Sequence, residues 1–379
     1  MFNNIEFSKQ YRDSFEICFK NITEEEEYLY FSNLHDFQIK YKTLIDNNIK
    51  WNTLKKKYNY YDLIYRNTNS NNNISHIKVI SRAYFKLNEI IIKYNLHNKN
   101  NSINYLCLCE APGGFIEYLI VMNKYKSYNI FTMSINDKFT PVYKYDMFKN
   151  PRIHILQGVD TTGNLYNLDN ILSIGKHVNN VELITADGGF DISNDYNNQE
   201  EISFRLIFCE CVSALIYNQI GGTFIVKIFD IFKQNTMELL YLMSCSYEYI
   251  DIYKPCLSRI CNSEKYVIFR GFKGISKNNL DKLKLIIKIY DKVDYNNFSL
   301  LKNKISRNFV EDIYELNKKY VFTQCVNILY LIHIDSILLS INYILNKQIY
   351  YGLKWCQVNN CSINYNSYFL KNYHTISKC

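Results

Sequence analysis

Several common signatures are missing from this 379-residue sequence. The first residues contain no charged segment followed by an apolar one, so we find no secretory signal. The 12 cysteines form no CxxC pair, and most lie in apolar runs, which is typical of reduced, buried thiols. The most apolar late stretch, residues 325–345, is interrupted by Asn, His and Asp, so it predicts a core helix instead of a membrane span. We therefore expect an intracellular protein, nuclear or cytoplasmic, without a membrane partner.

The composition excludes a disordered chain. Hydrophobic residues make up 47% and charged residues 21% of the sequence, which leaves enough apolar surface to offset the entropy lost on folding. A chain of this length predicts one large domain with additions, or two domains. The net charge of +8 fits a polyanionic partner, although a solvated basic surface is the commoner cause of such an excess.

The middle of the chain alternates short apolar runs with helical patterns. Residues 1–66 favour helices, and the polar tract 67–73 marks a linker or a long loop. Alternation of strand and helix predicts a doubly wound α/β sheet, with ligand sites at the carboxyl ends of its strands. The predicted strands are 105–109, 129–135, 153–156, 181–186, 222–228, 249–253 and 266–271.

These patterns divide the chain into three parts. An N-terminal extension covers residues 1–73, the α/β domain covers 74–274, and a helical C-terminal region covers 275–379. The C-terminal helices need to be buried somewhere, so they are either a docking module for other proteins or a buttress for the sheet.

The first predicted strand ends in the motif Cys109-Glu-Ala-Pro-Gly-Gly-Phe115, which a helix follows at once. Proline and two glycines form a tight turn without Cβ atoms, so a ligand can approach the unpaired N–H groups of the helix N-terminus. An ordinary turn between strand and helix has the same spacing. The motif matches neither GxGxxG nor GxxxxGK[ST], which disfavours a dinucleotide site and a P-loop.

Three later residues are candidates for chemistry. Asp187 follows the fourth predicted strand and precedes two glycines, a position that faces the ligand crevice, although Asp-Gly is also common in simple turns. Lys227 interrupts the apolar fifth strand, and a buried lysine needs a partner. A snorkelling edge lysine is the alternative, which the apolar neighbours on both sides disfavour. Glu264, beside the last strand, is either that partner or part of a polar cap.

The successive motifs resemble FtsJ-type ribose 2′-O-methyltransferases, and they are most similar to the mRNA cap 2′-O-methyltransferases of eukaryotes and large DNA viruses. The resemblance covers residues 81–274 and implies a Rossmann-like, seven-stranded sheet whose last strand is antiparallel, with helical N- and C-terminal extensions. It also implies methylation of RNA, with the first transcribed nucleotides of capped mRNA as substrate. The motifs are SRAYFKLNEI, CEAPGGF, TADGGFD, GGTFIVKIFD and SRICNSEKYVIFRGFKG.

The resemblance also assigns roles to single residues. It implies a catalytic tetrad of Lys86, Asp187, Lys227 and Glu264. For the cofactor S-adenosylmethionine it implies contacts with Cys109, Glu110, Ala111, Pro112, Gly113, Gly114 and Phe115 at the methionine part, with Asp160 and Thr161 at the adenosine, and with Ser81 as a further candidate. The implied RNA contacts are Asn197, Gln199 and Asn262. Glu110 stands where the family often has a small residue, and its carboxylate is able to pair with the ammonium of the cofactor.

The chemistry explains why a tetrad of this composition is needed. Methyl transfer from a sulfonium is an in-line displacement on an activated carbon, so the enzyme must align and deprotonate a hydroxyl and needs no metal. A lysine with the ordinary pKa of about 10.4 cannot act as a base at neutral pH. Burial and Lys86 are expected to lower the pKa of Lys227, whereas Asp187 and Glu264 oppose this. Our hypothesis is that Lys227 is the general base or the orienting group.

Two alternatives to a cap enzyme remain open. Methylation of ribosomal or transfer RNA is disfavoured by the length of the chain, and an inactive RNA-binding relative is disfavoured by the intact tetrad. Lys55-Lys-Lys57 beside Tyr58, Tyr60 and Tyr61 is the best candidate cluster for RNA, although a solvated helix face is the commoner explanation. Other capping or transcription proteins are expected partners, and the codon bias towards Asn, Ile, Lys and Tyr favours a virus or protist source.

Overall fold

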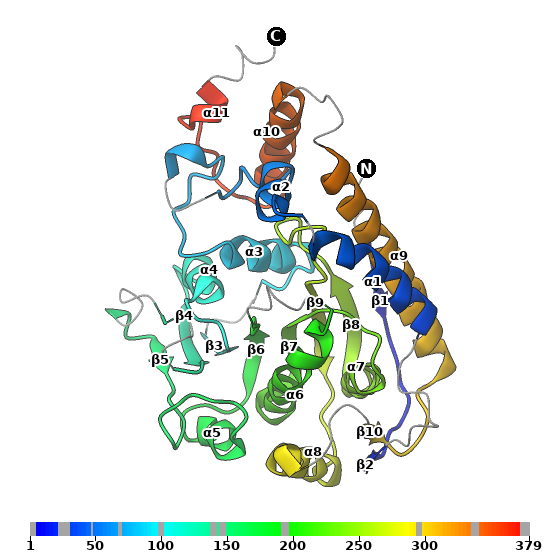
Figure 1. Ribbon diagram of the computed structural model, residues 1–379. Helices are drawn as coiled ribbons and strands as arrows, with labels where there is room; N and C mark the ends of the chain where they lie inside the picture. Colours follow the sequence, from blue (N-terminus) through cyan, green and yellow to red (C-terminus); the bar gives the residue numbers. More distant parts are fainter. Residues whose placement is uncertain are drawn as a thin grey trace.

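In the computed structural model, an eight-stranded sheet is covered by helices on both faces (Figure 1). The strands follow the order β1-β8-β9-β7-β6-β3-β4-β5 across the sheet. The structure describes residues 5–21, 31–46, 48–66, 70–97, 102–136, 142–143, 149–190, 197–292, 298–334 and 341–371.

The seven strands predicted from the sequence form the body of this sheet. The parallel strands are β3 (Ser102–Leu108), β4 (Ser127–Met133), β5 (Ile153–Ile155), β6 (Val181–Ala186) and β7 (Asn218–Ile228). As predicted, the last strand, β9 (Lys265–Phe272), is antiparallel, and it lies between β7 and β8 (Tyr247–Tyr253). The eighth strand, β1 (Ser8–Lys9), pairs with β8 and was not predicted, because only two residues of the N-terminal segment take part.

Alternate residues of each strand point to opposite faces of the sheet, which builds two apolar cores. Leu106 and Leu108 of β3 face one core, whereas Tyr105 and Cys107 face the other. The first core is covered by α5 (Leu168–Ser173), α6 (Gln199–Tyr217), α7 (Gln234–Ser246) and α8 (Lys277–Ile289). The second is covered by α3 (Ala83–Lys93), α4 (Gly114–Met122) and α10 (Ile341–Val358).

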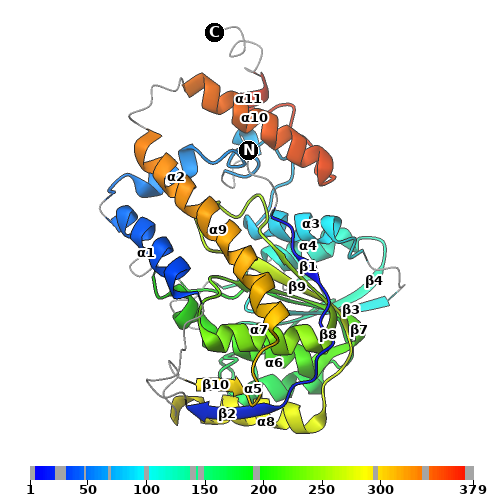
Figure 2. The same ribbon diagram turned by 90° about the vertical axis from the view of Figure 1, so that its right-hand side faces the viewer.

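The N- and C-terminal segments pack against each other beside the sheet (Figure 2). Helix α1 (Ser32–Asp46) lies along α9 (Arg307–His333), and α2 (Trp51–Lys57) contacts α9 as well. Strands β2 (Ile17–Asn21) and β10 (Phe298–Leu301) form a separate two-stranded sheet. The remaining elements are 3-10 turns at 70–72, 174–176 and 290–292, and α11 (Tyr368–Lys371). The extensions are therefore less purely helical than the sequence predicted, and the domain boundaries at 73 and 274 stay a prediction.

The apolar stretch 325–345, predicted as one core helix, belongs to two helices. Helix α9 ends at His333 and α10 begins at Ile341, while residues 335–340 lie outside the described residues. Among the helices that the structure describes, none is both long enough and apolar enough to cross a bilayer. The 11 cysteines in the described ranges are all free thiols.

Candidate active site

A cleft of about 570 Å³ opens at the carboxyl edge of the parallel strands. Residues that directly follow strands form its floor, with Cys109 after β3, Ser134 after β4 and Asp187 after β6. This is the edge at which the sequence predicted a ligand site. The opposite wall comes from the extensions and contains Lys42, Ile45, Trp51 and Gln324.

The predicted tetrad comes together as two ion pairs. Lys227, on β7, places its Nζ 3.2 Å from the Oδ1 of Asp187 and donates a hydrogen bond of 2.8 Å to the Asp187 carbonyl. Lys86, on α3, places its Nζ 2.7 Å from the Oε1 of Glu264. The four side chains are between 12% and 16% exposed, so each charge is largely shielded from solvent. Asp187, Lys227 and Glu264 line the cleft directly.

The charges within the tetrad hold it in its ionised form. Burial raises the pKa of Glu264, but Lys86 and Lys227 outweigh burial and bring that pKa below its usual value. Burial lowers the pKa of Lys227, but Asp187 and Glu264 outweigh burial and raise it. The sequence predicted opposing effects of burial and of the two carboxylates on the pKa of Lys227, and in the structure the carboxylates outweigh burial.

Tyr266 is a member of this cluster that sequence reasoning missed. It lies opposite Lys227 in the antiparallel register of β7 and β9, and its hydroxyl donates a hydrogen bond of 2.6 Å to the Oδ1 of Asp187. Burial, followed by the charge of Asp187, raises the pKa of this phenol well above its usual value, so the hydroxyl remains a donor. Asp187 is thus held by two donors from neighbouring strands. Pairing the last strand with the lysine strand would have revealed the tyrosine.

The glycine-rich motif forms the entrance to α4, as its spacing predicted. Gly113 has a φ of 108°, and a Cβ on Gly114 would lie 2.2 Å from the Oγ of Ser81. Gly113 thus allows the left-handed turn that starts α4, and Gly114 allows the first turn of α4 to pack closely against Ser81, just before α3. Cys109 and Ala111 of the motif line the cleft. Pro112 follows Ala111 through a cis peptide bond, and Phe115 is 1% exposed and packs in the core against Tyr266.

Two buried glutamates lie beneath the cleft floor. The carboxyl group of Glu110 is buried beside Thr185 and Cys107, and that of Glu210 is buried beside Cys109 and the Gly188 backbone. Burial raises the pKa of Glu110 well above its usual value and that of Glu210 to about 8. A Cβ on Gly188 would lie 2.3 Å from the Oε1 of Glu210, which places that acid directly under the residue after Asp187. Burial therefore favours the uncharged form of both acids, and neither lines the cleft, so the pairing of Glu110 with a ligand ammonium stays a prediction.

The adenosine contacts predicted at Asp160 and Thr161 do not line the cleft. The carboxylate of Asp160 accepts hydrogen bonds from Asn167, Thr162 and Asn170, and these bonds lower its pKa. Asp160 therefore organises its own loop. The residues of that loop that do line the cleft are Gly163, Asn164, Leu165 and Tyr166. The available sequence signal was Gly163 itself, a residue typical of tight turns; in the structure it has a φ of 66° and lies close to the Ser134 carbonyl.

Two of the three predicted RNA contacts lie on the cleft wall. Gln199 and Asn262 line the cleft, whereas Asn197 does not. Asn262 also borders a neighbouring, smaller cavity of about 110 Å³. The basic and aromatic cluster predicted from the sequence contributes to that second cavity through Lys55, Tyr58, Tyr60 and Tyr61. Residues 191–196, between Asp187 and Asn197, lie outside the described residues.

Known proteins share this sequence pattern. A protein named cap-specific mRNA (nucleoside-2′-O-)-methyltransferase 2 from Mus musculus is 30% identical over 228 residues, which are 53% of this chain and 29% of the relative. The protein of that name from Drosophila melanogaster is 34% identical over 239 residues, or 59% and 34% of the two chains. A cap-specific mRNA (nucleoside-2′-O-)-methyltransferase 1 from Trypanosoma brucei brucei is 31% identical over 219 residues, or 53% and 58%.

The chain spans about a third of the length of the first two relatives. The model of a family described as FtsJ-like methyltransferase matches residues 79–272, which are about half of the chain and include Lys86, Asp187, Lys227 and Glu264. The match agrees with the motif resemblance and with the arrangement of the sheet, and the chain therefore belongs to the FtsJ-like methyltransferase family.

Proposed function

We propose that this protein transfers the methyl group of S-adenosylmethionine to a ribose 2′-hydroxyl of RNA, in the first transcribed nucleotides of capped mRNA. The observation that carries this proposal is the pairing of Lys86 with Glu264 and of Lys227 with Asp187 at a cleft whose floor also contains Cys109 and Ala111 of the glycine-rich motif. The names of the curated relatives support capped mRNA as the substrate.

The cofactor half of the cleft is suited to a nucleoside with a charged tail. Cys109, Ala111 and Gly188 keep the floor free of bulky side chains, and Ser134 and Asn164 supply polar groups beside Leu165 and Tyr166. These residues would hold S-adenosylmethionine, whose use the family implies. When bound, the cofactor supplies an electrophilic methyl group.

The tetrad half is suited to holding a ribose hydroxyl. While charged, Lys227 can donate a hydrogen bond to the ribose oxygen at Nζ, and after losing one proton to solvent it can accept the hydroxyl proton there. The raised pKa of Lys227 favours the charged form, so orientation and stabilisation of the developing negative charge are its expected role at neutral pH. The ion pair with Asp187 holds the amine of Lys227 in position, and the ion pair with Lys86 holds the carboxylate of Glu264.

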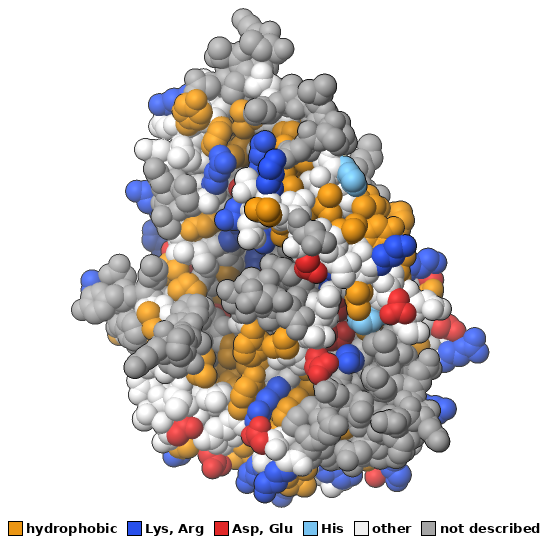
Figure 3. Space-filling model, viewed as in Figure 1, with side chains coloured by type: hydrophobic (Ala, Val, Ile, Leu, Met, Phe, Trp, Pro, Cys, Tyr) orange, Lys and Arg blue, Asp and Glu red, His pale blue; other side chains and the backbone are white. Residues whose placement is uncertain are grey.

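The surface around the site supports an RNA substrate. Lys and Arg side chains gather around α2 on the face seen in Figure 3. Gln199 and Asn262 offer amide groups on the cleft wall, and aromatic side chains border the neighbouring cavity. Cations hold a phosphate backbone and aromatic rings stack on bases, so these side chains are suited to an RNA strand. Capping or transcription proteins as partners, and the location of the protein in the cell, stay predictions.

The test is mass spectrometry of short RNAs after incubation with the protein and isotopically labelled cofactor. We expect one labelled methyl group on a ribose of capped RNA, and none on the same sequence without a cap. Equal labelling of uncapped RNA would assign the protein to the ribosomal or transfer RNA class. RNA binding without any transfer would instead identify an inactive relative.

A further inference from the structure

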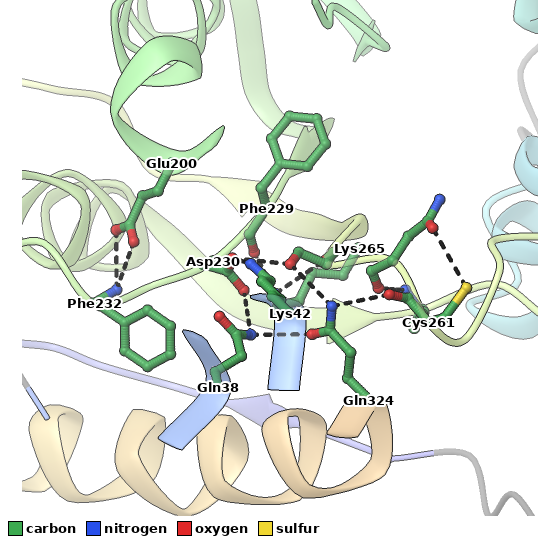
Figure 4. A network of polar contacts seen from close by, with 12 residues as sticks. Gln38, Lys42, Glu200, Phe229, Asp230, Phe232, Cys261, Lys265 and Gln324 are labelled. Carbon is green, nitrogen blue, oxygen red and sulfur yellow. Dashed lines mark hydrogen bonds and ion pairs between the residues drawn. The ribbon is translucent and has the colours of Figure 1, made fainter. Parts of the chain in front are cut away.

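A buried polar network lies beside the cleft, where the chain leaves β7 (Figure 4). At its centre is Asp230, which is 8% exposed and three residues after Lys227. Its Oδ2 accepts hydrogen bonds from the Nζ of Lys42 at 2.8 Å and the Oγ of Ser263 at 2.9 Å. Its Oδ1 accepts one from the Nε2 of Gln38 at 3.0 Å. One carboxylate therefore joins the end of β7, helix α1 and the loop before β9.

The same network holds the backbone on both sides of Glu264. Ser263 precedes this glutamate and binds Asp230, while Lys265 follows it and donates to the carbonyls of Ser263, at 3.1 Å, and Phe229. Gln324 of α9 donates to the carbonyl of Cys261 at 3.0 Å and accepts from Gln38 at 3.0 Å. The loop that carries Asn262 and Glu264 is thus bonded to α9 and to the residues after Lys227.

The segment after β7 is anchored on further elements as well. Glu200 of α6 accepts hydrogen bonds from the backbone N–H groups of Phe232 and Lys233. Asn317 of α9 donates to the carbonyl of Ile231 at 2.6 Å. Hydrogen bonds from α6 and α9 therefore anchor the segment that carries Asp230, which favours a fixed position of Asp230 relative to Lys227.

The negative charge of Asp230 is needed for this arrangement. Burial raises the pKa of this carboxyl, but Lys42 and Lys265 outweigh burial and bring the pKa below its usual value. The side chains of Lys42 and Lys265 are themselves buried. Removing the charge would leave the two cations to repel each other in a region that water reaches poorly.

We propose that Asp230 is a positioning residue for methyl transfer, which sets Glu264 and Asn262 relative to Lys227 through Ser263 and Lys265. Gln38, Lys42 and Gln324 lie outside the residues matched by the family model. The helical extensions accordingly take part in shaping the active site. This inference rests on the proposed function, since the tetrad is what Asp230 positions.

The variant Asp230→Asn keeps the shape of the side chain and removes its charge. Its control is Asp251→Asn, because Asp251 is also buried and paired with a cation, Arg270 at 2.6 Å, but lies on β8 away from the loop. We would measure hydrogen exchange of peptides covering 257–265, thermal unfolding, and kcat and KM for methyl transfer. Hydrogen exchange can be measured without enzymatic activity, so it tests the positioning role of Asp230 by itself. If the wild-type protein methylates no RNA, only the proposed function is contradicted.

For Asp230→Asn we expect faster exchange in 257–265 and a fall in kcat of about 10- to 100-fold, with the KM for S-adenosylmethionine changed less than about twofold. Asp251→Asn should lose stability without either effect. If both variants lose stability equally and kcat and the exchange pattern stay as in the wild type, Asp230 is merely structural.

If Asp230→Asn does not fold, Ser263→Ala decides the question, because it removes one bond to Asp230 and no charge. Faster loop exchange with a lower kcat would support the proposal, and wild-type values for both would overturn it.

Discussion

The two halves of the cleft are built on different physical principles. The cofactor half consists of small residues and turns, in which Cys109, Ala111 and Gly163 line the open space. The tetrad half consists of charged side chains that come from distant parts of the chain and are held by one another. In the first half, small side chains leave room for a ligand. In the second, ion pairs between opposite charges hold the catalytic side chains in place. Substitutions should therefore impair ligand binding in one half and catalysis in the other.

The largest effect is expected from Lys227→Met, which keeps the length of the side chain and removes its amine. We expect kcat to fall about 10³-fold, because the ribose hydroxyl loses its orienting cation. The affinity for S-adenosylmethionine should be retained. Single-turnover methyl transfer and titration calorimetry measure the two quantities, and Lys277→Met on the exposed start of α8 is the control. Near-normal turnover by Lys227→Met would contradict the assignment of the tetrad.

The next effect concerns pH and is expected from Glu264→Gln. The folded-state pKa of Glu264 is lowered, so its charge stabilises the fold above the ordinary glutamate pKa of about 4.3, and this stabilisation is lost as the pH falls below that value. The variant should lose about 3 kcal/mol of unfolding free energy at pH 7. Its deficit relative to the wild type should shrink on acidification, which urea unfolding at pH 7 and pH 3.5 would measure. A deficit independent of pH would argue against the pairing with Lys86.

A third effect should appear in the other half of the cleft, in Gly163→Ala. The added Cβ would lie 2.2 Å from the Ser134 carbonyl, at a φ of 66°. Moving the loop should weaken cofactor binding about tenfold, with kcat at saturation largely kept. Gly221→Ala is the matched control, because Gly221 has a φ of 79° but open space around it. Equal loss of affinity in both variants would mean that backbone strain alone, and not the cleft wall, is responsible.

The smallest effect is expected from Tyr266→Phe, which removes one of the two donors to Asp187. A hydrogen bond to a charged group contributes about 2 kcal/mol, part of which Lys227 retains by holding the same carboxylate. We expect a lower melting temperature and a fall in kcat of less than about tenfold. Thermal unfolding and steady-state kinetics measure these changes. A loss as large as that of Lys227→Met would make the phenol a principal catalytic group.

The strands were predictable because their apolar runs are long and are bounded by turn residues. The tetrad was predictable because its members lie within motifs of a known order. Strands β1, β2 and β10 were missed, since each is short and finds its partner far away in the sequence, as Ser8 does opposite Asp251. The bond between Lys42 and Asp230 spans 188 residues, and no local pattern marks it.

The direction of the pKa shift of Lys227 could also not be predicted from the sequence alone. Burial and two carboxylates act on that amine in opposite directions, and the result depends on distances that only the fold determines. The same holds for the raised pKa of Glu210, which follows first from the burial of this carboxyl group beneath Gly188. The sequence motifs identify which side chains come together in the site, but the packing around each side chain determines its pKa.

The two-residue strand β1 has a consequence for the outer rim of the sheet. An uncovered strand offers free backbone groups to other molecules and invites intermolecular pairing. Ser8 and Lys9 occupy that place opposite Asp251 and Ile250, and the Phe7 carbonyl binds the N–H of Ile252. Residues 7–9 thus cover part of the edge of β8, and deleting them would expose the backbone groups of residues 250–252 to pairing with other molecules.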